Sequence, residues 1–203
     1  MGNTKKTQAN ANIISFGMEE IDKCLPAGGV RHGQLMMVSS VSGGGKTTFA
    51  SQLASSIVAQ ERNCLVFELE QSAGTFYSNY LEAQVSKMGA KKRATMLEKL
   101  QRRLLIADGI HSGSSGTMTP LRVENSIRDA EVQHFGSPVE VVIIDHLGLV
   151  AGNPMQELFQ ICKKSNVLMI VIGTLPKGTP AGVYVGLPWS VGTTSQVNFC
   201  DYI

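Results

Sequence analysis

The segment 39–48 reads Ser-Ser-Val-Ser-Gly-Gly-Gly-Lys-Thr-Thr and lies between an apolar run and an amphipathic run. Its glycines let backbone N–H groups close around an anion, the Lys46 ammonium can reach the outer phosphates of a nucleotide, and the Thr47 hydroxyl is a ligand for Mg²⁺. A helix predicted directly after the segment would add unpaired N–H groups and the positive end of its dipole. The segment therefore predicts a phosphate-binding loop for a nucleoside triphosphate and Mg²⁺.

The surroundings of this loop favour that interpretation over a flexible glycine-rich turn with a solvated lysine. Residues 35–38 predict a strand before it, and Phe49, Leu53 and Ile57 recur on one face of the helix after it. One position departs from the usual pattern, because Ser40 stands where a glycine is common. We expect a negative φ at Ser40 and phosphate binding of altered strength. The residues expected to contact the nucleotide are Ser42, Gly43, Gly44, Gly45, Lys46, Thr47 and Thr48.

Composition limits the class of protein. The chain has 203 residues, of which 43% are hydrophobic and 17% charged, with a formal net charge of +2. These values are typical of one globular domain, and the charge neither requires nor excludes nucleic acid. The four cysteines and four histidines are scattered, so we expect reduced thiols and no zinc site. The N-terminus is polar and no apolar run could span a bilayer, so we expect a cytoplasmic protein without a membrane partner.

Strand and helix patterns alternate along the chain, which predicts an α/β fold with a mostly parallel central sheet and helices on both faces. Thr119 is expected to cap a helix that begins at Pro120, and Asn153 to cap another in the manner of a capping box completed by Gln156. The loop over residues 174–193 is rich in glycine and proline and is either functional or a disordered surface loop. The predicted strands are 35–38, 64–69, 104–107, 141–144, 167–172 and 198–203, and the other predicted helices are 18–25, 47–60, 74–88 and 91–100.

Two carboxylates follow buried strands. Asp145 ends the run Val-Val-Ile-Ile-Asp, a pattern that brings an Asp beside Mg²⁺, although such residues also cap helices. Glu68 and Glu70 lie at the tip of the strand predicted at 64–69, where alternation puts them on the same side, and Glu70 is nearer the carboxyl edge, where ligands bind in parallel sheets. We therefore predict Asp145 as a metal ligand and Glu70 as the general base for an attacking water, with a plain surface glutamate as the alternative.

Four segments stand in order along the chain and read Phe-Gly-Met-Glu-Glu-Ile-Asp at 16–22, Gly-Gly-Val-Arg-His-Gly-Gln-Leu at 28–35, Leu-Val-Phe-Glu-Leu-Glu-Gln-Ser at 65–72 and Ile-Ile-Asp-His-Leu-Gly-Leu at 143–149. Together they resemble segments of the RecA-like ATPase family, most closely the helicase domain of the DnaB type and its RadA and KaiC relatives.

The resemblance covers residues 14–203 and implies a RecA-like three-layer ATPase that works as a ring, expected to be a hexamer, or as a filament, with ATP at subunit interfaces. Lys46 and Thr47 would hold the phosphates and Mg²⁺, Asp145 would complete the metal shell, and Glu70 would polarise the water. Residues 1–13 are expected to be a flexible tail.

The chain also departs from the family it resembles. Thr174 stands where DnaB-type proteins often have a Gln that senses the γ-phosphate, and Thr is shorter. Lys177 resembles a lysine of RadA proteins that would act in trans, but an ordinary loop lysine fits equally well. The chain stops before the C-terminal hairpin that supplies a basic finger to the neighbouring subunit in relatives, so that hairpin is expected to be lacking.

We expect single-stranded DNA as a partner. Trp189 is either a stacking platform or a hydrophobic contact, and the basic runs 91–93 and 102–103 either touch phosphates or are solvated faces. The leading hypothesis is an ATP-hydrolysing motor that acts on DNA in replication or recombination. The alternative is a KaiC-like regulatory module whose output is nucleotide-dependent assembly, with little turnover. A small-molecule kinase is disfavoured, since no arginine-rich lid follows the phosphate loop.

Overall fold

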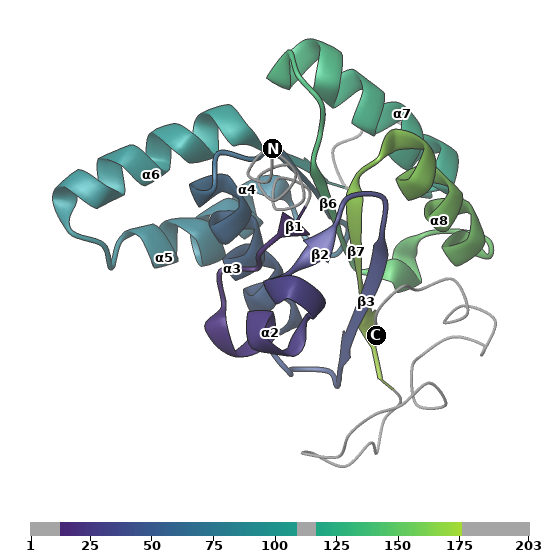
Figure 1. Ribbon diagram of the computed structural model, residues 1–203, viewed down its shortest axis with the longest axis horizontal. Helices are drawn as coiled ribbons and strands as arrows, with labels where there is room; N and C mark the ends of the chain where they lie inside the picture. The colour runs from purple at the N-terminus through teal and green to yellow at the C-terminus, as the bar shows by residue number, and fades with distance from the viewer. Residues whose placement is uncertain (1–12, 109–116, 176–203) are drawn as a thin grey trace, which may run out of the picture.

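A parallel sheet of five strands forms the centre of the molecule (Figure 1). The computed structural model describes residues 13–108 and 117–175. The strands are nearly continuous apolar runs, as expected for a sheet that is covered on both faces. Their order in space is β3-β7-β6-β4-β5, and every pairing is parallel. Their bounds are β3 (Leu35–Ser40), β4 (Cys64–Glu68), β5 (Leu104–Asp108), β6 (Val141–Asp145) and β7 (Leu168–Thr174).

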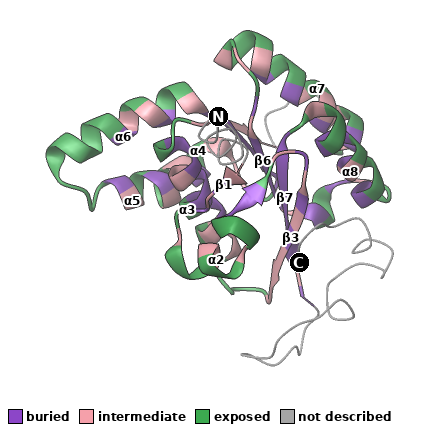
Figure 2. Cartoon of the chain, viewed as in Figure 1, coloured by how far each residue is buried: buried purple, intermediate pink, exposed green. Residues whose placement is uncertain are grey.

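Helices cover both faces of this sheet and bury two separate cores, which confirms the predicted three-layer α/β fold. Alternate strand residues such as Val66 and Ile143 pack on one side, and Phe67 and Ile144 pack on the other. Figure 2 shows the buried strands between the half-exposed helices. The first face is covered by α3 (Lys46–Ala59), α5 (Ala83–Val85) and α6 (Ala90–Arg103), and the second by α7 (Pro120–Asp129) and α8 (Pro154–Ser165).

The predicted helices are present, with two corrections. The helix predicted over 74–88 is divided into α4 (Ala73–Phe76), the π-helical turn η2 (Tyr77–Glu82) and α5. The side chain of Thr119 caps α7, as predicted, because its hydroxyl accepts the N–H of Arg122 at 3.3 Å. The capping box predicted for α8 is wrong, since the Asn153 side chain makes no capping hydrogen bond there. Pro154 at the first position still provides a φ suited to a helix start.

Short elements complete the described part of the chain. An antiparallel pair is formed by β1 (Ile13–Ile14) and β2 (Val30–Arg31), and between them lie α2 (Glu19–Cys24) and the 3₁₀ turn η1 (Pro26–Gly28). A π-helical turn, η3 (Ala130–Phe135), extends α7, and a 3₁₀ turn, η4 (Leu147–Leu149), follows β6. Among residues 13–108 and 117–175, no helix is long and apolar enough to cross a membrane.

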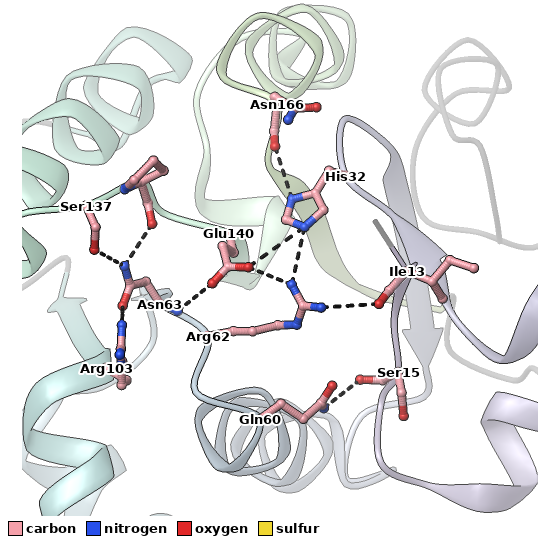
Figure 3. A network of polar contacts seen from close by, with 11 residues as sticks. Ile13, Ser15, His32, Gln60, Arg62, Asn63, Arg103, Ser137, Glu140 and Asn166 are labelled. Atoms are coloured by element: carbon pink, nitrogen blue, oxygen red, sulfur yellow. Dashed lines mark hydrogen bonds and ion pairs between the residues drawn. The ribbon is translucent and has the colours of Figure 1, made fainter. Parts of the chain in front are cut away.

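Polar side chains join the amino ends of the strands, at the edge opposite the phosphate loop (Figure 3). One carboxylate oxygen of Glu140 accepts from the Arg62 guanidinium at 2.6 Å, and the other accepts the N–H of Asn63 at 3.3 Å. Arg62 also donates to the carbonyl of Ile13, which ties β1 to the sheet. Burial lowers the pKa of His32 beside this pair, and Glu140 opposes that shift. This edge is a structural anchor.

Candidate active site

The phosphate loop joins the carboxyl end of β3 to the start of α3. Gly43 and Gly45 have φ values of 76° and 79°, a region that glycine adopts without strain. The Lys46 ammonium folds back over the loop and donates to the carbonyl of Val41 at 3.2 Å. No side chain caps the N-terminus of α3, so its first N–H groups remain available to an anion. The loop therefore has the geometry of a phosphate-binding site.

The unusual serine of the loop is matched by a glycine four residues later. Ser40 is the last residue of β3, and its φ is not positive, as predicted. Its hydroxyl occupies the space beside Gly44: a Cβ on that glycine would lie 2.6 Å from the Ser40 Oγ and 2.9 Å from the carbonyl oxygen of Val41. Ser40 is thus accommodated because Gly44 has no side chain.

Two carboxylates lie side by side at the carboxyl ends of neighbouring strands. Glu68 in β4 and Asp145 in β6 are register partners, so their side chains share one face of the sheet. That face is the one covered by α3, since Val66 and Ile143 precede them by two residues and belong to the core there. Both are almost fully buried, with exposures of 0% and 1%.

The surroundings of Asp145 fit a divalent cation. Burial has the largest effect on the pKa of its carboxyl and raises it. The Thr47 hydroxyl and the charge of Lys46 lower this pKa, whereas the charge of Glu70 raises it. The Thr47 hydroxyl is therefore near, yet neither oxygen of Asp145 makes a well-formed hydrogen bond with any described residue. A buried carboxylate without partners is costly unless a cation or water completes it. Mg²⁺ prefers such oxygen ligands, so Thr47 and Asp145 suit it.

The Glu68 side chain holds the backbone of the two residues Glu70 and Gln71 that follow β4. Its Oε1 accepts the N–H groups of Glu70 at 3.0 Å and Gln71 at 3.2 Å, while Oε2 has no partner among the described residues. Burial, followed by the charge of Asp145, raises the pKa of Glu68 to about 7. The side chain therefore holds the turn that carries Glu70.

Glu70 itself is half exposed at the mouth of the site. Its Oε1 lies 3.0 Å from Nε2 of His146, the residue that follows Asp145. Thr174, at the end of β7, is the register partner of Ser40, and the N–H of Leu175 donates to the Ser40 carbonyl at 2.9 Å. The structure thus places the predicted Glu70, Asp145, Thr174 and the phosphate loop at one edge of the sheet.

A comparison with known proteins identifies the chain. The family model of the DnaB-like helicase C terminal domain matches residues 14–170, which is more than half of the sequence. The chain belongs to this family. Membership implies a RecA-like ATPase motor of the replicative helicase type, with nucleotide and Mg²⁺ as the family's general cofactors.

Two solved structures share the fold of this DnaB-like domain. A solved ATPase domain superposes with a TM-score of 0.64 at 16% identity, over 85% of this chain and 68% of that one. A DnaB-like replicative helicase, solved in a study of its interactions with primase, superposes with a TM-score of 0.62 at 16% identity. That comparison covers 84% of this chain and 46% of the helicase, so this chain spans less than half of that protein.

Two polar groups of the DnaB-like domain were not recognised as site residues in the sequence. Alternation places Glu68 and Glu70 on one side of the strand, and the position of Glu70 nearer the carboxyl edge favoured Glu70 alone. His146 carried no signal except its position after Asp145. The predicted roles of Lys177 and Trp189, the predicted strand 198–203 and residues 1–12 of the predicted tail lie outside the described residues, while Ile13, the last residue of that tail, belongs to β1.

Proposed function

We propose that this chain binds ATP with Mg²⁺ and hydrolyses it, with Glu70 as the general base. The observation that carries the proposal is the buried Asp145 carboxylate, whose oxygens have no hydrogen-bond partner among the described residues and which lies beside Thr47 at the phosphate loop. Lys46 and the N–H groups at the start of α3 would bind the phosphates, while Thr47 and Asp145 would hold the cation. Bound Mg²⁺ supplies charge neutralisation at the β- and γ-phosphates.

Glu70 suits the role of base because it is close to the metal site without being part of it. Its charge acts on Asp145, yet its side chain remains half exposed and can reach a water molecule. A carboxylate so placed accepts a proton from the water as the oxygen attacks the γ-phosphorus. Thr174, beside Ser40, is the candidate to contact the γ-phosphate, and the direct phosphate contacts would come from Ser42, Gly43, Gly44, Gly45 and Thr48.

We further propose that ATP turnover acts on single-stranded DNA within a ring of several copies, as a motor of the replicative helicase type. Family membership supports this proposal. In the described part of the chain, the run 91–93 on α6 has three exposed basic residues in a row and is the candidate for contacts with phosphates. Arg103 is less suited, because it already donates to Asn63 at 3.0 Å and lies 3.7 Å from Glu61. Lys177 is the candidate for a cation that acts on the neighbouring nucleotide.

The test is an ATPase assay on the full chain, with and without single-stranded DNA. We expect Mg²⁺-dependent turnover that rises with DNA, loss of ATP binding in Lys46→Ala, and loss of turnover with binding intact in Glu70→Gln. Glu157→Gln, an exposed carboxylate on α8, is the matched control and should behave as wild type. Tight ATP binding without any turnover would contradict the motor proposal. ATP-dependent sedimentation in that case would favour the regulatory assembly module instead.

A further inference from the structure

The general-base candidate lies beside a histidine whose tautomer is set by a hydrogen bond from the backbone. His146 Nδ1 accepts the N–H of Gly148 at 2.9 Å, and its Nε2 lies 3.0 Å from Glu70 Oε1. Because a backbone N–H can only donate, Nδ1 carries no proton in this arrangement. The proton of the neutral ring is therefore on Nε2, the atom that lies 3.0 Å from Glu70 Oε1 and faces that carboxylate.

The imidazole is also fixed in space. His146 is the N-cap of η4, and its side chain is only 19% exposed. A Cβ at position 148 would lie 2.6 Å from Cε1 of the ring, so the ring fills the room that a side chain on Gly148 would need. The hydrogen bond and this close approach together hold Nε2 in one direction, toward Glu70.

The backbone beneath Glu70 is fixed from the opposite side. Glu68 accepts the N–H of Glu70, and the N–H of Leu69 donates to the carbonyl of Asp145 at 2.7 Å. What remains free is the side chain of Glu70, which is 50% exposed and would otherwise sample several rotamers. The contact with His146 restricts that freedom.

We propose that His146 is a positioning residue that holds the Glu70 carboxylate ready to accept a proton from the attacking water. The inference rests on the ATPase function proposed above. Nε2–H occupies Oε1, which leaves Oε2 to take the proton. As that proton moves, the water oxygen bonds to the γ-phosphorus, and the bond from phosphorus to the bridging oxygen breaks, so that ADP leaves with the electron pair. Placement of this kind governs how often the water and its base meet in a reactive geometry.

Two substitutions separate positioning from capping. His146→Asn places an amide oxygen near the place of Nδ1, so it keeps the acceptor for Gly148 and loses the donor to Glu70. His146→Gln extends an amide nitrogen near the place of Nε2, so it keeps the donor and loses the cap. If His146 positions Glu70, kcat should fall on the order of 10-fold or more in His146→Asn, while ATP affinity stays unchanged. In His146→Gln most of the wild-type kcat should remain. A role in capping alone predicts the reverse order.

The readouts are kcat with single-stranded DNA, affinity for a fluorescent ATP analogue, and thermal unfolding of the full chain. In a Glu70→Gln background, His146→Asn should cause no further loss, because it acts through Glu70. If His146→Asn fails to fold, the result for His146→Gln decides: retained kcat supports positioning and lost kcat overturns it.

Two failures can be told apart. A kcat within twofold of wild type in folded His146→Asn, alongside an inactive Glu70→Gln, overturns the positioning role and leaves the ATPase intact. No turnover in wild type, or full turnover in Glu70→Gln, overturns the proposed function and the positioning role with it.

Discussion

Replacing Glu68 with Gln should stabilise the nucleotide-free protein at alkaline pH. The carboxyl is fully buried, and burial together with the charge of Asp145 raises its pKa from 4.5 to about 7. A glutamine keeps an oxygen that can accept the N–H groups of Glu70 and Gln71, and it carries no charge beside Asp145. The substitution therefore removes the buried charge and keeps the acceptor.

The magnitude follows from the two pKa values of Glu68. Below about pH 4.5 the carboxyl is protonated in both the folded and the unfolded state, so its ionisation does not lower the free energy of unfolding. Between about pH 4.5 and 7 the folded state binds more protons, and the free energy of unfolding falls as the pH rises. Above about pH 7 the ionised Glu68 lowers the free energy of unfolding by about 3 kcal/mol. The pKa values of the folded and unfolded states differ by roughly 2.5, and each pKa unit corresponds to about 1.36 kcal/mol. Glu68→Gln should gain up to about 3 kcal/mol at pH 8 and only about 1 kcal/mol at pH 5.

Urea unfolding at both pH values, in EDTA and without nucleotide, measures this difference. The exposed Glu157→Gln on α8 serves as the matched control and should change the free energy of unfolding little at either pH. The reasoning is refuted if the gain from Glu68→Gln is the same at pH 5 and pH 8, or if the variant is less stable than wild type at pH 8.

Three other substitutions test separate parts of the structure. Gly44→Ala should weaken ATP affinity and destabilise the loop by about 1–3 kcal/mol, because its Cβ would meet the Ser40 hydroxyl, and Ser40→Gly in the same chain should recover part of both losses in calorimetry. Thr47→Ala should abolish the dependence of ATP affinity on Mg²⁺ in titrations with and without EDTA, and an unchanged dependence would remove Thr47 from the metal site. Glu140→Gln should cost about 1–3 kcal/mol in urea unfolding, because the partly buried Arg62 loses its anionic partner, and it should leave ATP affinity unaltered.

The layers of the fold could be predicted because continuous apolar runs indicate strands that are buried on both faces of a sheet. It predicted α3 to within one residue for the same reason, since Leu53 and Ile57 repeat at helical spacing and are fully buried. The π-helical turn at Tyr77–Glu82 could not be predicted, because one additional residue per turn is tolerated only by the packing around it. The cap predicted at Asn153 was wrong, because a residue type that often caps helices does not ensure that its side chain makes the capping hydrogen bond.

Site residues that follow the ends of strands could be predicted from the sequence. Contacts that depend on how neighbouring strands are aligned could not. Asp145 and Glu70 each follow an apolar run, and the carboxyl ends of parallel strands meet at one edge. Nothing in the sequence states that Glu68 pairs directly with Asp145, because that needs the alignment of β4 on β6. The contact of His146 with Glu70 likewise depends on the turn after β6, where the ring accepts the N–H of Gly148.

The fit between Ser40 and Gly44 has an evolutionary consequence. Since the hydroxyl of one lies where a side chain of the other would lie, the two positions are not free to vary independently. With glycine at position 40 the contact of 2.6 Å is lost, and the Val41 carbonyl oxygen at 2.9 Å is then the atom that limits a side chain at position 44, whereas serine at position 40 requires glycine at position 44. A lineage could pass from one state to the other most easily through glycine at both positions.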